Sequence, residues 1–321
     1  MRKKFFAPLL VILVIVYVAI LRFQGFDLSV FSKVDPYYVL FAVLISFLTL
    51  TLRSFKYFLL LRTIGVNLDK SILMITNYGF FSNFISPVRI SEIVRSYLIK
   101  IKTKQSFFKI LPPTIFDSLA DGAVLIFIII ILSFFVGFSF DYASRVVFLI
   151  IIIATAVISF YIMTSRRGEK LVLFLLPKLF KRFVGKEIKN KSKLFIRISK
   201  LMLSKKKTLL AVFVLTFLSW GVEGIRFYLI ARAAGIPIDF FLATILITTA
   251  YLLGGSFINP SGIVQEAVLL ILLLQLPYDK LSLTLAGSLD AVISIGFVLI
   301  LGLLYTLKLG TGRFKINEAK N

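Results

Sequence analysis

The chain contains no cysteine and no histidine among its 321 residues. Without cysteine there is no disulfide and no thiol chemistry, and without histidine the commonest zinc ligands are missing as well. Acidic residues are scarce, with 15 Asp and Glu against 38 Lys and Arg, which gives a formal net charge of +23. We therefore expect no metal and no cofactor.

Apolar side chains dominate instead, at 59% of the residues, with a mean hydropathy of +0.98. A water-soluble protein of this size could not bury so much apolar surface. Several apolar runs reach about 20 residues, the length that a helix needs to cross the hydrocarbon core. Because these runs are continuous rather than alternating, they indicate helices. The sequence predicts an all-α polytopic integral membrane protein with a single transmembrane domain, 1–321.

The excess of positive charge is compatible with binding either to nucleic acid or to a membrane surface. In a chain this apolar, Lys and Arg in short loops mark the cytoplasmic side and attract anionic lipids. We therefore expect membrane phospholipids or a lipid-linked substrate as partners, and no nucleic acid. Basic residues stand at the amino end, at Arg2, Lys3 and Lys4, and again after the last apolar run. A multi-pass protein of the cell membrane with both termini in the cytoplasm is expected.

The charges between the apolar runs predict the topology. Counting Lys and Arg in short loops gives about 6 full crossings. They cover residues 5–21, 37–61, 112–138, 146–163, 208–230 and 281–307.

Two other apolar segments, 71–87 and 240–276, are interrupted by proline and small polar residues. If the first crossed fully, the basic run that starts at Arg89 would lie outside the cell. We therefore predict two re-entrant helical hairpins, the first entering from the cytoplasm and the second from outside, for about 8 membrane segments in total. Full crossings with a returning leg stay open as the alternative.

The two halves of the chain match each other in sequence. Residues of the first half recur 170 positions later at Arg62/Arg232, Gly65/Gly235 and Asp69/Asp239, and 173 positions later at Pro87/Pro260 and Asp117/Asp290. Repeat one, 37–138, and repeat two, 208–307, are separated by an odd number of predicted crossings, so we expect an inverted repeat. An inverted pair of broken, polar membrane segments is typical of a carrier.

A basic linker, 165–207, joins the halves, with 15 Lys and Arg against two Glu. We expect it to be cytoplasmic and interfacial, resting on anionic headgroups. An amphipathic helix is expected in it, whose apolar face is formed by Leu194, Phe195, Ile198, Leu201 and Met202.

Ionisable side chains inside membrane segments cost about 2.5–3.5 kcal/mol each on insertion scales and indicate function by default. One set suits a phosphate-bearing headgroup, because guanidinium forks match phosphate oxygens. It comprises Arg53, Asn83, Arg89, Glu92 and Arg95. A second set would balance charge or carry a proton, and comprises Asp117, Asp121, Glu223, Glu266 and Asp290. The hairpins are broken at Pro87, Pro260 and Gly262.

A purely structural role stays open for two members of these sets. Glu223 is three residues before Arg226, so the two could form a local pair on one helix face. Glu266 could be an interfacial carboxylate in water.

The run from Asn83 to Leu98 reads Asn-x3-Pro-x-Arg-x-Ser-Glu-x2-Arg-x2-Leu. It resembles the membrane region of lysylphosphatidylglycerol synthase and its stand-alone, flippase-like relatives in bacteria and archaea. The resemblance extends from the first helix to Leu307. The departures are Ser91, Ser261 and Val264, which replace glycines, and Thr114, which replaces an arginine.

This resemblance implies the movement of polar-headed lipids across the bilayer. The soluble aminoacyl-transferring domain of the full synthases is not in this sequence, which ends at Asn321, so no lysyl transfer is expected. We predict a lipid flippase or transporter for a phospholipid or a polyprenyl-phosphate lipid, and not an enzyme.

Two alternatives stay open. A membrane-embedded enzyme could bind Mg²⁺ through paired carboxylates, although the sequence lacks an Asp-x-Asp motif and the alcohol phosphotransferase pattern. An accessory subunit could recruit a lipid-modifying enzyme through the basic linker. A homodimer is a further candidate assembly.

Overall fold

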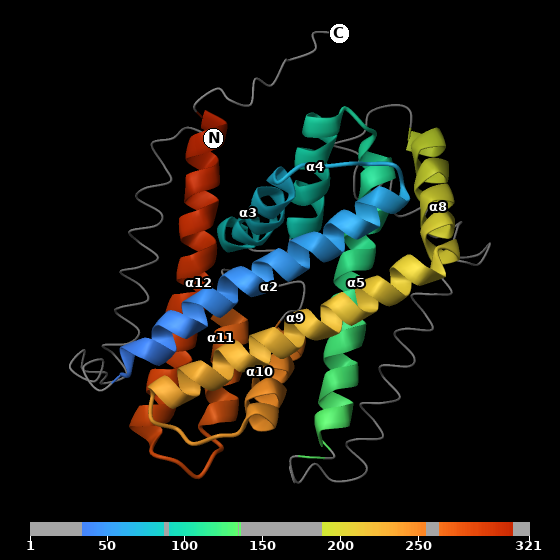
Figure 1. Cartoon of the computed structure of the whole chain (residues 1–321). Coiled ribbons are helices and arrows are strands. Elements are labelled where there is room, and N and C mark those ends of the chain that lie inside the picture. Colours follow the sequence, from blue (N-terminus) through green and yellow to red (C-terminus); the bar gives the residue numbers. More distant parts are fainter. Residues whose placement is uncertain (1–33, 87–89, 134, 136–187, 255–262, 311–321) are drawn as a thin grey trace.

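The computed structural model describes residues 34–86, 90–133, 135, 188–254 and 263–310. Within these ranges the chain forms α-helices joined by short turns, and no strand occurs (Figure 1). The prediction of an all-α polytopic protein is confirmed at this level. Two of the predicted crossings, 5–21 and 146–163, lie outside the described residues, as do Pro87, Arg89, Pro260 and Gly262.

Four of the described helices are long and apolar enough to cross a membrane. They are α2 (Pro36–Thr63), α5 (Phe107–Ser133), α9 (Lys206–Ala233) and α12 (Lys280–Gly310). At most 39% of the most apolar window of each helix is buried inside the protein.

Helix α5 begins earlier than the sequence suggests. We expected a start near Pro112, but the helix begins at Phe107 and contains Pro112 and Pro113 within its second turn. The lost backbone hydrogen bonds are offset by packing, because Phe107, Phe108 and Leu111 are buried against Phe195 of α8 (Ile188–Ser204). Asp117 consequently lies ten residues into the helix, about 15 Å from its start.

The shorter helices come in two pairs. The first pair is α3 (Ser71–Ile85) and α4 (Ser91–Thr103), and the second is α10 (Phe240–Gly254) and α11 (Ile263–Leu273). Each has at most 15 residues, fewer than the roughly 20 that a crossing needs. Figure 1 shows the pairs toward opposite ends of the long helices.

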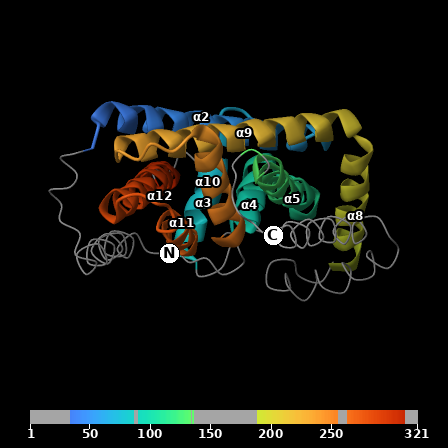
Figure 2. The same cartoon turned by 90° about the horizontal axis from the view of Figure 1, so that it is seen from below.

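Helices α2 and α9 lie side by side and run in opposite directions, and α5 and α12 also run in opposite directions (Figure 1). Figure 2 shows α2 and α9 along one side of the molecule, with the two helix pairs, α5 and α12 against them.

Matched sequence positions adopt the same local structure in both halves. Helices α2 and α9 have 28 residues each, and α3 and α10 have 15 each. Just beyond α2 and α9 come Gly65 and Gly235, with φ of 70° and 77°. This left-handed conformation favours glycine, and the glycine N–H closes each helix end on the carbonyl of Arg62 or Arg232.

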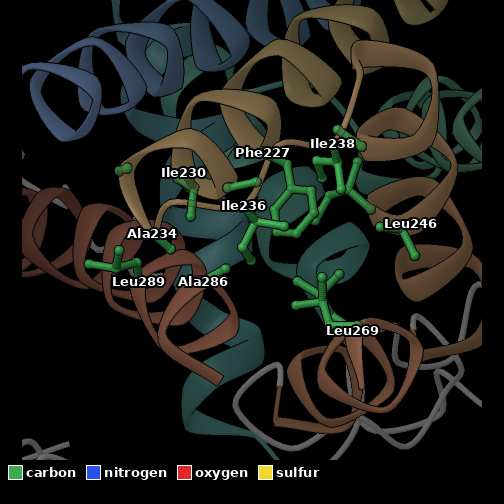
Figure 3. Packing of buried hydrophobic residues seen from close by; sticks show 14 of the residues in the cluster. Phe227, Ile230, Ala234, Ile236, Ile238, Leu246, Leu269, Ala286 and Leu289 are labelled. Atoms are coloured by element: carbon green, nitrogen blue, oxygen red, sulfur yellow. The ribbon is translucent and has the colours of Figure 1, made fainter. Parts of the chain in front are cut away.

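Apolar packing joins the halves. One cluster is centred on Phe227 of α9, which packs among Ile236, Leu246 and Leu269 (Figure 3), and it also includes Ala42 of α2. A second cluster lies mainly in the first half, where it includes Tyr57, Leu60 and Ile75. It also contains Val212 of α9 and Tyr305 of α12.

Helix α8 (Ile188–Ser204) packs on protein. The side chains of Phe195, Ile198 and Met202 are buried against neighbouring helices, and only Leu201 of the expected apolar face is exposed. The apolar face of α8 is therefore covered by α5 and its neighbouring helices, whereas we expected this face to rest on lipid.

Helices α3 and α12 can pack closely because Gly302 of α12 has no side chain. A Cβ atom at Gly302 would overlap the ring of Phe81, whereas a Cβ at Gly296 of the same helix would meet nothing within 4 Å. Gly302→Ala should therefore lower the free energy of unfolding by about 1–3 kcal/mol. Gly296→Ala should leave it unchanged or raise it by up to about 1 kcal/mol. Thermal unfolding in nanodiscs measures both, and equal effects would contradict this packing.

Candidate functional site

Charged side chains lie between the helices in two groups, and all of them are buried except Asp121 and Glu266, which are half-buried. The first charge cluster is Lys56, Arg95, Asp117 and Asp121, and the second charge cluster is Glu223, Arg226, Glu266 and Asp290. A buried charge is tolerated only when it is paired or hydrogen-bonded, so the partners in each cluster decide its chemistry.

Asp117 is the centre of the first charge cluster. Its carboxylate accepts a hydrogen bond from Nη1 of Arg95 at 2.6 Å, and Nζ of Lys56 lies 3.0 Å from its other oxygen. Lys56 also lies 2.7 Å from Asp121, one helical turn further along α5. Lys56, Arg95 and Asp117 are at most 3% exposed, so these contacts tie α2, α4 and α5 together away from solvent.

Aromatic and hydroxyl groups hold Arg95 in place. Its guanidinium lies over the ring of Tyr57 at 4.9 Å, and the Tyr57 hydroxyl pairs with Thr114 at 2.6 Å. Ser96 pairs with the same threonine at 2.9 Å. A side chain at Gly79 would overlap Arg95, so α3 also approaches this group closely. Thr114, a departure from the related sequences, thus belongs to a buried hydroxyl network.

Asn83 and Glu92 organise the link between α3 and α4. The side-chain oxygen of Asn83 accepts hydrogen bonds from the backbone N–H groups of Ile90 and Ser91, both at 2.9 Å. Glu92 accepts from the hydroxyls of Ser118 at 2.7 Å and Ser91 at 3.0 Å. Asn83, which we predicted to bind a headgroup, uses its carbonyl to hold the start of α4.

Arg226 is the centre of the second charge cluster. Its guanidinium lies 2.8 Å from Glu223 on the same helix and 2.9 Å from Asp290 on α12. Asp290 is fully buried, and Glu223 is 4% exposed. Tyr251 of α10 contacts Glu223 at 3.5 Å, and Ser294 contacts Glu266 at 3.3 Å.

The two clusters are built on equivalent contacts. Lys56 and Arg226 are 170 positions apart, and Asp117 and Asp290 are 173 positions apart. These are the separations that relate the matched residues of the two halves. The ion pair between α2 and α5 therefore recurs between α9 and α12.

Arg53 lies between the clusters. Its guanidinium is 4.8 Å from the centre of the Trp220 ring, 5.9 Å from that of Tyr251 and 5.7 Å from that of Phe80. It thereby connects α2 with α9, α10 and α3. Its Nε and Nη2 atoms are buried, and neither has a hydrogen-bond partner among the described residues.

One carboxylate outside the membrane helices links α4 to the turn before α3. Asp69 accepts from Nζ of Lys102 at 2.6 Å and from the backbone of Ser71 at 3.0 Å. These hydrogen bonds, that of Lys102 foremost, hold the pKa of Asp69 well below its ordinary value. The Asp69 side chain is 71% exposed, so solvent screening keeps the stabilisation small.

The predicted site residues thus fall into three places. Arg95, Asp117 and Asp121 meet in the first charge cluster, with Glu92 nearby through Ser118. Glu223, Glu266 and Asp290 lie in the second, and Arg53 lies between them. We did not predict Lys56 and Arg226 as site residues, although each shares a helix face with one, Arg53 and Glu223 respectively. The sequence signal that could have identified Lys56 and Arg226 is their equivalent position in the two matching halves.

Within the described ranges, no group of three or more carboxylates is arranged to hold a metal ion. The site offers cations, carboxylates and hydroxyls instead. Such an arrangement can bind an anionic group and can take up or release protons.

Asp117 should matter more for stability than its neighbour. Asp117→Asn leaves the buried Lys56 and Arg95 without the carboxylate that both of them contact, so we expect a loss of about 3–5 kcal/mol in the free energy of unfolding. Asp121→Asn should cost less than about 1 kcal/mol, because Lys56 keeps Asp117 and the Asp121 side chain is 19% exposed. Denaturant unfolding in lipid nanodiscs would measure the difference, and similar losses would refute the central role of Asp117.

Known proteins resemble this chain over most of its length. The family model for the lysylphosphatidylglycerol synthase TM region matches residues 5–302. A UPF0104 membrane protein of Methanothermobacter thermautotrophicus is 27% identical over 247 residues, which is 72% of this chain and 73% of the relative. No solved structure matches significantly. Since the match covers nearly the whole chain, the protein belongs to the family of the lysylphosphatidylglycerol synthase transmembrane region.

Proposed function

We propose that this protein is a lipid transporter, which moves a phospholipid or a polyprenyl-phosphate lipid across the bilayer. Its family and its long apolar helices support a multi-pass membrane protein that acts on lipids. The observation that carries the proposal is the pair of buried charge clusters, built on equivalent ion pairs in two halves of the chain. Membrane proteins keep such costly groups mainly along pathways for polar or charged substrates.

An inverted repeat with two re-entrant hairpins is part of this proposal. It is supported by the opposite directions of α2 and α9 and of α5 and α12, and by the short helix pairs at opposite ends of the long helices (Figure 1). In transporters of this design, the substrate site lies where the two repeats meet, and one repeat rocks against the other. Repeat one would span 37–138 and repeat two 208–307, with the basic linker 165–207 and both termini in the cytoplasm.

The headgroup would bind at the arginines of the first half. Arg53 is the leading candidate, since its Nε and Nη2 atoms have no hydrogen-bond partner among the described residues and it lies between the two halves. Arg89 and Arg95 would complete the phosphate site, and Glu92 would balance their charge. The acyl chains would stay in the bilayer while the headgroup passes between the clusters.

The protein would act on the lipid without changing it covalently. A membrane-embedded enzyme that acts on the same lipid is the alternative. The lipid is the principal partner, and a lipid-modifying enzyme or a second copy of the chain would be additional ones.

Removal of a phosphate-binding arginine should slow transport. In liposomes that contain a fluorescent phospholipid, Arg53→Ala and Arg89→Ala should each lower the flip rate at least about tenfold, because a hydrogen bond to a charged group contributes about 1.5–3 kcal/mol. Lys100→Ala, which removes an exposed cation of α4, is the matched control and should keep the wild-type rate. Equal rates for wild type and Arg89→Ala would remove Arg89 from the mechanism.

The same liposomes separate a transporter from an enzyme. A transporter delivers intact lipid to the opposite leaflet, and mass spectrometry of the extracted lipids should find no new species. Release of a soluble headgroup by the purified protein would overturn the proposal in favour of a membrane-embedded enzyme.

A further inference from the structure

The two charge clusters share one ion pair but differ in their supply of cations. In the first, Asp117 meets both Lys56 and Arg95. In the second, Asp290 forms an ion pair with Arg226, and Arg226 also forms an ion pair with Glu223. If Glu92 is matched with Glu266, 174 positions later, the position of Arg95 corresponds to Leu269, which is apolar and 1% exposed. The second charge cluster therefore has three carboxylates beside one cation, whereas the first has two cations beside Asp117, Asp121 and the neighbouring Glu92.

The ion pairs identify the carboxylate that lacks a cation. Glu223 and Asp290 each contact Arg226 directly, at 2.8 Å and 2.9 Å. Glu266 makes no ion pair within the described chain, so its negative charge would be uncompensated. The Glu266 side chain is half-buried and its Oε2 atom is fully buried, and a carboxylate without a charge partner in such surroundings tends to take up a proton.

The hydrogen bonds around Glu266 support the same conclusion. Oγ of Ser294 lies 2.7 Å from the backbone carbonyl of Asp290 and 3.3 Å from Oε1 of Glu266. A serine hydroxyl has one hydrogen, and a carbonyl can only accept. When the hydroxyl donates to the nearer Asp290 carbonyl, its contact with Glu266 is satisfied only if Glu266 carries a proton and donates it to the Ser294 oxygen.

The matched residue in the first half has different surroundings. Glu92 accepts hydrogen bonds from two serine hydroxyls, those of Ser118 at 2.7 Å and Ser91 at 3.0 Å. Two donors suit an ionised carboxylate. The second oxygen of Glu266 is buried and has no hydrogen-bond partner among the described residues. Among the described residues, Oε1 of Glu266 has longer contacts, with Ser294 at 3.3 Å and Gln265 at 3.5 Å, so the surroundings of the two matched glutamates differ.

We infer that Glu266 is a proton-binding site in the second half of the protein, neutral when loaded and ionised when empty. Loading forms one O–H bond between a proton and the Glu266 carboxylate, and no other covalent bond changes. Glu266 lies in the first turn of α11, where the helix dipole partly stabilises the ionised form, so the proton can leave. The titratable, charged and hydrogen-bonding groups around it are Arg53 of α2, Glu223 and Arg226 of α9, Tyr251 of α10, Gln265 of α11, and Asp290 and Ser294 of α12.

This site would couple lipid movement to a proton gradient, and that coupling rests on the proposed transport function. Ionisation of Glu266 would leave the second charge cluster with an uncompensated negative charge. The conformation that admits water or a cationic group to Glu266 would then be favoured over the closed one. The proton site itself does not depend on transport, so the two can be tested separately.

Infrared spectroscopy of the full-length protein in nanodiscs tests the proton site directly. Near neutral pH the wild type should show the C=O stretch of a protonated carboxyl group, and the band should disappear on raising the pH. Glu266→Gln should abolish the band and should fold normally, because glutamine resembles a neutral carboxylic acid. Glu92→Gln, the matched control, should leave the band in place. Ser294→Ala should shift the band by removing the acceptor of the proton.

Absence of the band in the wild type, or its persistence in Glu266→Gln, would overturn the inference. A flip assay with a pH gradient then tests the coupling, and wild type should respond to the gradient while Glu266→Gln should not. An equal response in both would overturn the coupling. If wild type moves no lipid at all, the transport proposal fails, while the infrared result still decides the proton site.

Discussion

The cost of burying charge is the constraint on which the rest of this structure depends. Asp117 stays buried because Lys56 and Arg95 both contact it, and each cation comes from a different helix. The three side chains therefore fix the rotation of α2, α4 and α5 relative to one another. Removing one partner would leave an uncompensated charge, which is far more costly than the pair itself is stabilising. Because each of these charges needs its particular partner, the buried ion pairs specify one arrangement of the helices.

The second half repeats this arrangement with fewer cations. Arg226 and Asp290 reproduce the pair of Lys56 and Asp117, but Leu269 stands where the first half has Arg95. The halves are thus alike in their helices and unlike in their electrostatics. In the proposed transporter, the first half would provide cations for an anionic headgroup, and the second would provide carboxylates for a proton. A carrier assembled from two halves can in this way separate its substrate site from its coupling site.

Much of the helical framework could be predicted from the sequence. The runs of apolar residues indicated α2, α9 and α12 nearly to their ends. The predicted start of α5 near Pro112 is wrong, because the burial of Phe107 and Phe108 against other helices extends α5 to before the two prolines. The apolar face of α8 was recognised, but a periodic pattern does not indicate whether lipid or protein covers that face.

The sequence by itself determined that this protein is helical, lies in a membrane and contains two matched sets of polar residues, since these properties follow from composition, periodicity and spacing along one chain. Only the tertiary structure decided which charges meet. Lys56 contacts Asp117 and Asp121, Arg226 contacts Asp290, and Ser294 rather than a cation contacts Glu266. These contacts depend on the rotation and depth of separate helices, which packing sets and no local pattern records.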